Sequence, residues 1–214
     1  MAEALPADIV TAQIEAVVAD FGVHAAKTGM LANAAIVEAV SAAVRDLEIP
    51  MLVVDPVMVA KSGDRLLDED AIAAMKTELV AQAFLVTPNI PEAEALANIE
   101  IRTVDDRKEA ARRIVDMGAS AVVIKGGHLP SDNITDLLLH EGEFVEFSHV
   151  RVPGRHTHGT GCTFSAAVTS HLAKGHDLPT AIRGAQHYVA EAIRHAPQLG
   201  RGHGPLGHFF KFKG

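Results

Sequence analysis

The chain has 214 residues, of which 48% are hydrophobic and 21% charged, and its formal net charge is −8. This length favours one well-filled domain, residues 1–214, and an acidic chain without a Lys/Arg-rich run is not typical of a nucleic-acid-binding protein. No apolar stretch approaches the roughly 20 residues that span a bilayer, no secretion signal precedes Asp8, and a lone cysteine cannot form an internal disulfide, so we expect a cytoplasmic protein without membrane partners.

Short apolar strands alternate with helical periodicity up to residue 124. The pattern predicts strands at 24–27, 51–54, 84–86 and 121–124, and helices at 8–20, 33–47, 68–80, 91–97 and 105–117. Asn33 is the expected N-cap of the second helix, whose buried stripe would consist of Ile36, Val40, Val44 and Leu47. This alternation is typical of a parallel sheet with helices on both faces.

The pattern changes after Lys125. Segments 134–140 and 144–152, joined by Glu141-Gly142-Glu143, predict an antiparallel hairpin at the sheet edge. Helices at 160–174 and 180–196 complete the fold before a Gly- and His-rich tail, and no linker or repeat marks a second domain. The sequence therefore predicts an α/β fold, a three-layer sandwich whose sheet is mostly parallel.

The run from His156 to Ala167 joins a glycine-spaced turn directly to a helix of small residues. Gly159 and Gly161 lack Cβ atoms, and the free N–H groups and macrodipole of the helix start favour an anion there. Cys162 lies in the first turn, where the same field favours the thiolate, although a cysteine is also a common small buried hydrophobe. The run predicts a phosphate site beside a polarised proton acceptor, which suits phosphoryl transfer.

Polar residues also follow three of the predicted strands. Ligands bind at the carboxyl ends of strands in open parallel sheets, where the sequence places Asp55, Asn89, Glu92, Lys125 and Gly127. Asp55 and Glu92 are suited to Mg²⁺, which takes one or two carboxylates and keeps several waters. Lys125 is suited to neutralising charge on a transferring phosphoryl group.

Each of these residues also has a purely structural interpretation. Asp55 and Asn89 are common in turns, Glu92 would favour a helix start without any metal, and Lys125-Gly126-Gly127 is an ordinary loop sequence. Their occurrence at successive strand ends favours a site. His156-x-His158 suggests zinc, but the absence of a further Cys or His at motif spacing disfavours that interpretation.

Six segments in order carry a resemblance to a known family. They are Lys27–Leu31 (KTGML), Asp55–Asp64 (DPVMVAKSGD), Thr87–Leu96 (TPNIPEAEAL), Lys125–His128 (KGGH), His156–Ala167 (HTHGTGCTFSAA) and Gly204–Phe210 (GPLGHFF). Over its whole length the chain resembles the bacterial hydroxymethylpyrimidine/phosphomethylpyrimidine kinases of thiamine biosynthesis. The resemblance implies a ribokinase-like fold, a homodimer, and Mg-ATP as phosphoryl donor to the hydroxymethyl group and then to the monophosphate.

The resemblance also implies roles for residues that match the family's motifs. It implies an anion hole made of Gly159, Thr160, Gly161 and Cys162. In that hole Cys162 either accepts the substrate proton or only shapes the hole. The resemblance implies Mg-ATP contacts from Asp55, Asn89, Glu92, Lys125 and Gly127, with the metal at Asp55 and Glu92 and a charge-stabilising role for Lys125. It implies a pyrimidine pocket that includes Met30, Val57 and Cys162.

One departure concerns the beginning of the sequence. The family starts with a strand, a glycine-rich segment and a second strand, whereas this sequence enters at the helix that follows them. We therefore expect part of the substrate clamp to be absent and apolar sheet residues such as Val53 and Leu85 to be exposed.

Two alternative functions stay open. The chain could be a pyridoxal-type vitamin kinase, because those enzymes share much of the scaffold, or a non-catalytic nucleotide-binding remnant. A sugar or nucleoside kinase is disfavoured, because Cys162 stands where those relatives carry an Asp.

Overall fold

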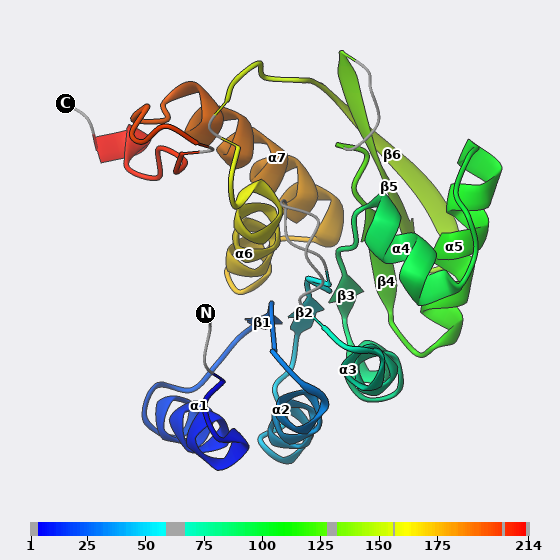
Figure 1. The fold of residues 1–214 in the computed structure, drawn as a ribbon, viewed down its shortest axis with the longest axis vertical. Helices are drawn as coiled ribbons and strands as arrows, with labels where there is room; N and C mark the ends of the chain where they lie inside the picture. Colours follow the sequence, from blue (N-terminus) through cyan, green and yellow to red (C-terminus); the bar gives the residue numbers. More distant parts are fainter. Residues whose placement is uncertain (1–3, 59–66, 128–131, 156, 203, 213–214) are drawn as a thin grey trace.

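The computed structural model describes residues 4–58, 67–127, 132–155, 157–202 and 204–212, which build a six-stranded sheet (Figure 1). The strands lie in chain order: β1 (Ala26–Thr28), β2 (Leu52–Val54), β3 (Leu85–Val86), β4 (Ala121–Ile124), β5 (Asn133–His140) and β6 (Glu143–Val150). The first four strands are parallel, and the β5–β6 hairpin adds to β4 in antiparallel orientation. The predicted sheet is therefore confirmed.

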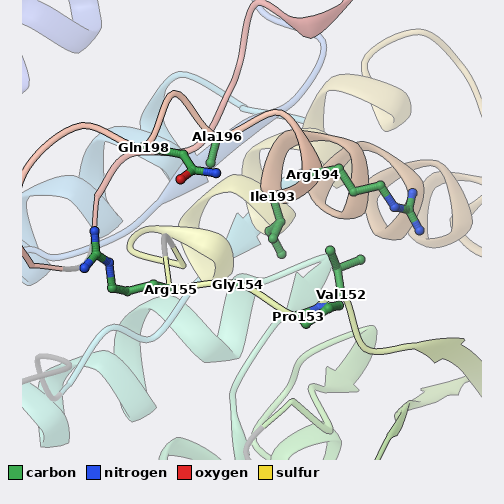
Figure 2. Close-up of a pocket in the computed structure, with 8 residues that line it drawn as sticks. All are labelled: Val152, Pro153, Gly154, Arg155, Ile193, Arg194, Ala196 and Gln198. Carbon is green, nitrogen blue, oxygen red and sulfur yellow. The ribbon is translucent and has the colours of Figure 1, made fainter.

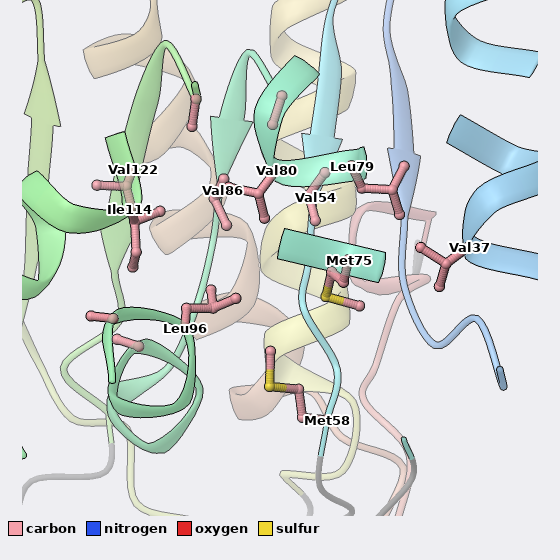
Figure 3. Packing of buried hydrophobic residues seen from close by; sticks show 14 of the residues in the cluster. Val37, Val54, Met58, Met75, Leu79, Val80, Val86, Leu96, Ile114 and Val122 are labelled. Carbon is pink, nitrogen blue, oxygen red and sulfur yellow. The ribbon is translucent and has the colours of Figure 1, made fainter. Parts of the chain in front are cut away.

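Helices cover both faces of the sheet, as Figure 1 shows. They are α1 (Ala7–Phe21), α2 (Ala34–Asp46), α3 (Glu69–Ala74), α4 (Ile90–Ala97), α5 (Val104–Asp116), α6 (Thr160–Leu172) and α7 (Leu178–Arg194). Alternate strand residues point to opposite faces. Val54, Val86 and Val122 accordingly pack with residues of α2 to α5 (Figure 3), while Val53 and Leu85 pack with residues of α6 and α7. The arrangement is the predicted three-layer sandwich.

The expectation that Val53 and Leu85 are exposed is wrong, because both are fully buried under α6 and α7. The edge strand of the described sheet opposite β6 is β1. Helix α1 packs mainly against α2 and contains no buried residue, and its Phe21 is 81% exposed. No helix in the described ranges is long and apolar enough to cross a membrane.

Two local features differ from the prediction. Segment 68–80 is not one α-helix: α3 ends at Ala74 and continues as a π turn (Met75–Leu79) and a 3₁₀ turn (Val80–Gln82). Leu79 and Val80, neighbours in sequence at this change of winding, are both fully buried. In the hairpin, Glu141 and Gly142 form a two-residue turn with φ of 52° and 80°, the positive values that a type I′ turn requires.

Candidate active site

The site is built around Asp55, which directly follows β2 and is 2% exposed. Its Oδ1 lies 3.0 Å from Lys125 Nζ and accepts a 3.3 Å hydrogen bond from Thr87 Oγ1. Its Oδ2 accepts a 3.1 Å hydrogen bond from Ser165 Oγ and lies 3.8 Å from Lys27 Nζ. One buried carboxylate thus holds side chains from β1, from the ends of β3 and β4, and from α6.

The charge of Asp55 is stabilised by these neighbours. Burial by itself would raise the pKa of this carboxyl group, because desolvation disfavours the charged form. The charges of Lys125 and Lys27, with hydrogen bonds from Lys125 and Ser165, outweigh burial and lower the pKa below its ordinary value. Asp55 is therefore a carboxylate at neutral pH.

Backbone hydrogen bonds hold the loop that carries Lys125 from two sides. Its N–H donates to Pro88 O at 2.8 Å, and it forms a parallel bridge with Asn89. The next N–H, that of Gly126, donates to Asp136 Oδ1 at 2.8 Å. A Cβ atom on Gly126 would overlap the carbonyl oxygen of Thr135, so only glycine fits this approach. The loop after β4 is thereby fixed between β3 and β5.

The predicted anion hole lies at the start of α6, beside Lys125. Gly159 is the N-cap with φ of 80°, and Thr163 N–H makes a 2.9 Å bond to its carbonyl oxygen. A Cβ atom on Gly161 would lie 3.3 Å from Lys125 Nζ, so the missing side chain lets the ammonium approach the first turn. The Thr160 hydroxyl donates to Thr157 O at 3.2 Å. A fixed cation thus faces the N–H groups of a helix start, the arrangement that binds phosphate.

Cys162 differs from the prediction in its charge state. Its side chain is exposed, and its carbonyl oxygen lies 3.0 Å from Ser165 Oγ, as a second acceptor beside Asp55 for the one Ser165 hydroxyl proton. Partial desolvation by its neighbours, the charge of Asp55 and a side-chain hydrogen bond to Asp55 raise the pKa of the thiol, and Lys27 and Lys125 oppose the shift without cancelling it. The prediction of a favoured thiolate is wrong, because partial desolvation and the neighbouring Asp55 carboxylate both disfavour the charged form.

Glu92 and Asn89 form a capping box at the start of α4. Glu92 N–H donates to Asn89 Oδ1 at 2.9 Å, and Asn89 N–H donates to Glu92 Oε2 at 2.8 Å. Burial raises the pKa of Glu92 to about 7, the charge of Asp55 adds to the shift, and Lys125 and the Asn89 N–H oppose it. The capping interpretation is thus confirmed for both residues, and it leaves Glu92 partly protonated near neutral pH.

The two carboxylates fit a water-mediated Mg²⁺ ion better than a directly coordinated one. Both oxygens of Asp55 already contact ammonium or hydroxyl groups, which leaves little room for a metal in direct contact. Glu92 carries an unfavourable buried charge that a cation would stabilise. No cluster of three or more His, Cys, Asp or Glu residues able to hold a metal occurs in the described parts of the chain. A Mg²⁺ ion that keeps its waters and also binds phosphates needs no such cluster.

The other predicted residues lie at the same edge of the sheet. Met30 follows β1 and is 45% exposed, and half-buried Val57 donates its N–H to Asp55 O at 2.8 Å. Gly127 is exposed, and its carbonyl oxygen accepts a 3.1 Å bond from Arg151. His158 is exposed. Residues 59–64, His128 and His156, which belong to the quoted motifs, lie outside the described residues.

Three residues of the charge network were missing from the sequence-based list of site residues: Lys27, Thr87 and Ser165. Ser165 Oγ donates to a carboxylate 110 positions away in sequence, and Lys27 Nζ lies 3.2 Å from Ser165 Oγ. Lys27 lies in β1 and is the first residue of the KTGML segment, and Thr87 directly follows β3. Only the place of Thr87 directly after a strand was an available signal, because Ser165 lies within α6 and Lys27 within β1.

A cavity of about 430 Å³ is lined in part by residues 152–155, which precede the anion hole in the sequence (Figure 2). It is lined by Val152, Pro153, Gly154, Arg155, Ile193, Arg194, Ala196 and Gln198. Ile193 of α7 points toward the Val152–Pro153 segment, which gives the cavity an apolar wall. Its volume falls within the range of small-molecule sites.

The sandwich, the helix start that faces a lysine and the buried Asp55–Lys125 pair are the features expected of a small-molecule kinase. A family model described as phosphomethylpyrimidine kinase matches residues 1–207, so the chain belongs to that family. It is 46% identical over 198 residues to the hydroxymethylpyrimidine/phosphomethylpyrimidine kinase of Bacillus subtilis, covering 92% of this chain and 73% of that protein.

Other relatives are similar over nearly the whole of this chain. The chain is 45% identical over 204 residues to the thiamine biosynthesis bifunctional protein ThiED of Geobacter sulfurreducens, covering 95% of this chain and 42% of that longer protein. The crystal structure of an ADP complex of Bacillus subtilis pyridoxal kinase matches with a TM-score of 0.89 and 35% identity, covering 98% of this chain and 79% of that one. The predicted fold and family are confirmed.

Proposed function

We propose that this protein transfers the γ-phosphoryl group of ATP to hydroxymethylpyrimidine and then to its monophosphate, giving the pyrophosphate used in thiamine biosynthesis. The observation that supports this most directly is the position of Lys125. Its ammonium lies 3.0 Å from Asp55 Oδ1 and faces the anion hole across Gly161. A cation fixed in this way stabilises charge that develops on a transferring phosphoryl group without moving during the reaction.

In this proposal the phosphates of ATP bind the N–H groups of Gly159 to Cys162. We propose that the rest of the nucleotide extends into the cavity of Figure 2, whose wall includes residues 152–155 of the segment that leads to the anion hole. Asn89 and Gly127 border the phosphates, and Glu92 and Asp55 hold Mg²⁺ through water. When bound, this metal neutralises phosphate charge. Replacing Glu92 with Gln should raise the Mg²⁺ concentration for half-maximal turnover, and an unchanged value would leave Glu92 with the capping role alone.

The raised pKa of Cys162 supports a shaping role for this residue over a proton-accepting one. A neutral thiol is a poor base, and phosphoryl transfer through a loose transition state requires little proton removal before bond formation. We therefore propose that Cys162 shapes the anion hole and that Met30 and Val57 line the pyrimidine pocket. Cys162→Ser should retain most of the turnover number, whereas a loss of about 100-fold or more would restore the base role.

Pyridoxal is the second candidate substrate, favoured by the structural match to a pyridoxal kinase. ADP release measured side by side with hydroxymethylpyrimidine, pyridoxal and ribose tests the choice. We expect the highest kcat/KM with the pyrimidine, a lower value with pyridoxal and none with ribose. A preference for pyridoxal would reassign the substrate. No turnover with any acceptor would favour the non-catalytic remnant, although the assembled charge network supports catalysis.

The proposal also includes a homodimer in the cytoplasm, where ATP is available to a biosynthetic kinase. Light scattering coupled to gel filtration measures the mass of the particle in solution. A mass of twice that of the chain is expected, and a strictly monomeric active enzyme would contradict this part of the proposal.

A further inference from the structure

Lys27 is a second cation in the site that the transfer step described above does not use. It lies in β1, on the other side of β2 from Lys125. Its Nζ is 3.2 Å from Ser165 Oγ and 3.8 Å from Asp55 Oδ2, a distance too long for a hydrogen bond. Its side chain is 24% exposed, compared with 14% for Lys125. Lys27 is therefore the more exposed of the two lysine side chains.

The charge balance around Asp55 leaves Lys27 available to a ligand. One carboxylate faces two lysines, and Lys125 is the closer partner at 3.0 Å. An ammonium has three N–H donors, and Ser165 Oγ is positioned to accept only one of those of Lys27. Asp55 and Ser165 thus orient the Lys27 ammonium and leave some of its N–H donors for a ligand.

The position of Lys27 points to the acceptor side of the reaction. It comes from the strand that leads to Met30, in the proposed pyrimidine pocket. Its charge also acts on Cys162 in the first turn of α6. A Cβ atom on Gly29 would lie 3.2 Å from its Nζ, so the chain after β1 also packs against the ammonium. Lys27 is therefore close both to the first turn of α6 and to the segment that leads from β1 to Met30.

The two proposed phosphorylations differ in the charge of the acceptor. In the first, an alcohol oxygen bonds to the γ-phosphorus, the bond to ADP breaks and one proton is released. In the second, a phosphate oxygen of the monophosphate forms the new P–O bond, ADP leaves and no proton is released from the dianion. A phosphate monoester carries about −1.5 to −2 charge at pH 7, so only the second acceptor brings a large negative charge toward ATP.

We propose that Lys27 is the residue that makes the monophosphate an acceptable substrate, by binding its phosphate group during the second phosphorylation. This inference rests on the proposed function. Lys125 stabilises the transferring group in both steps, whereas Lys27 contributes mainly to the step in which the acceptor is itself an anion.

The test compares kcat/KM for the alcohol and for the monophosphate in Lys27→Met. We expect the ratio of monophosphate to alcohol to fall about 30-fold or more, because a hydrogen bond to a charged group is lost only with the phosphorylated acceptor. Most of the fall should be in the KM for the monophosphate. Lys27→Arg keeps the charge and should restore much of the ratio. Since both substrates are assayed with one preparation, loss of folded protein cancels in the ratio.

Lys125→Met is the matched comparison, and it should lower both values by similar factors. Equal losses with both acceptors in Lys27→Met would overturn the inference. So would a wild-type enzyme that phosphorylates the alcohol but not the monophosphate, although the kinase assignment would stand. A wild-type enzyme inactive with both acceptors would instead refute the proposed function.

Discussion

The buried carboxyl group of Glu92 makes a quantitative prediction about stability. Its pKa is raised from 4.5 to about 7 in the folded protein, so the folded state binds a proton more tightly than the unfolded chain. The stability contributed by this proton is fully present below pH 4.5 and is lost as the pH rises through about 7. Glu92→Gln mimics the protonated form at every pH and should escape this loss.

The size of the effect follows from the shift. A change from 4.5 to about 7 corresponds to about 3 kcal/mol in total, most of which falls between pH 5 and pH 8. Urea unfolding of wild type and Glu92→Gln at several pH values, with a chelator present to exclude metal, measures the difference. The variant should gain stability relative to wild type as the pH rises.

The control for this experiment is Glu38→Gln, which changes an exposed carboxylate on α2. Because Gln at position 92 can still accept the Asn89 N–H, the capping geometry is kept. Parallel stability curves for wild type and Glu92→Gln across this range would refute the reasoning. That result would mean that water or a nearby charge stabilises the Glu92 carboxylate.

Three further predictions concern the anion hole and the loop after β4. Cys162 should react with iodoacetamide with an apparent pKa above that of a free thiol, since partial desolvation and Asp55 raise it, and the chain's lone cysteine makes the rate simple to measure. A midpoint below the ordinary value would contradict this. Lys125→Met should lower kcat by about 100-fold in steady-state assays, and a loss of under threefold would exclude it from charge stabilisation. Gly126→Ala should lower the free energy of unfolding in urea by about 2 kcal/mol, because its Cβ would overlap the Thr135 carbonyl. Gly127→Ala, whose Cβ meets open space, should cost much less. Equal costs would refute the packing argument.

The periodicity of the sequence was sufficient for the fold. Strand 121–124 agrees with β4 at both ends, and Asn33 caps α2 through Ile36 N–H as predicted. Boundaries elsewhere differ by one to a few residues, since helix ends depend on local hydrogen bonds that a periodic pattern does not encode. The winding change at Met75 was not predictable, because a periodic pattern of apolar residues does not distinguish a π turn from an α-helix.

The site was only partly predictable for a related reason. Residues at strand ends could be placed at one edge of the sheet, because parallel strands end together. The charge state of Cys162 could not be predicted, since it depends in part on Asp55, which is remote in sequence and buried beside the thiol. Lys27 and Ser165 were missed for the same reason, because their roles come from contacts made only in the folded chain.

The carboxylate of Asp55 also links activity to the cooperativity of unfolding. Its partners come from β1, α6 and the ends of β3 and β4, elements that are scattered along the chain. Separation of any one of these elements from the sheet would leave a buried charge with fewer partners, which is costly. Heat inactivation and loss of the sheet should therefore occur in a single transition, so that residual activity measures the fraction of molecules with an intact sheet.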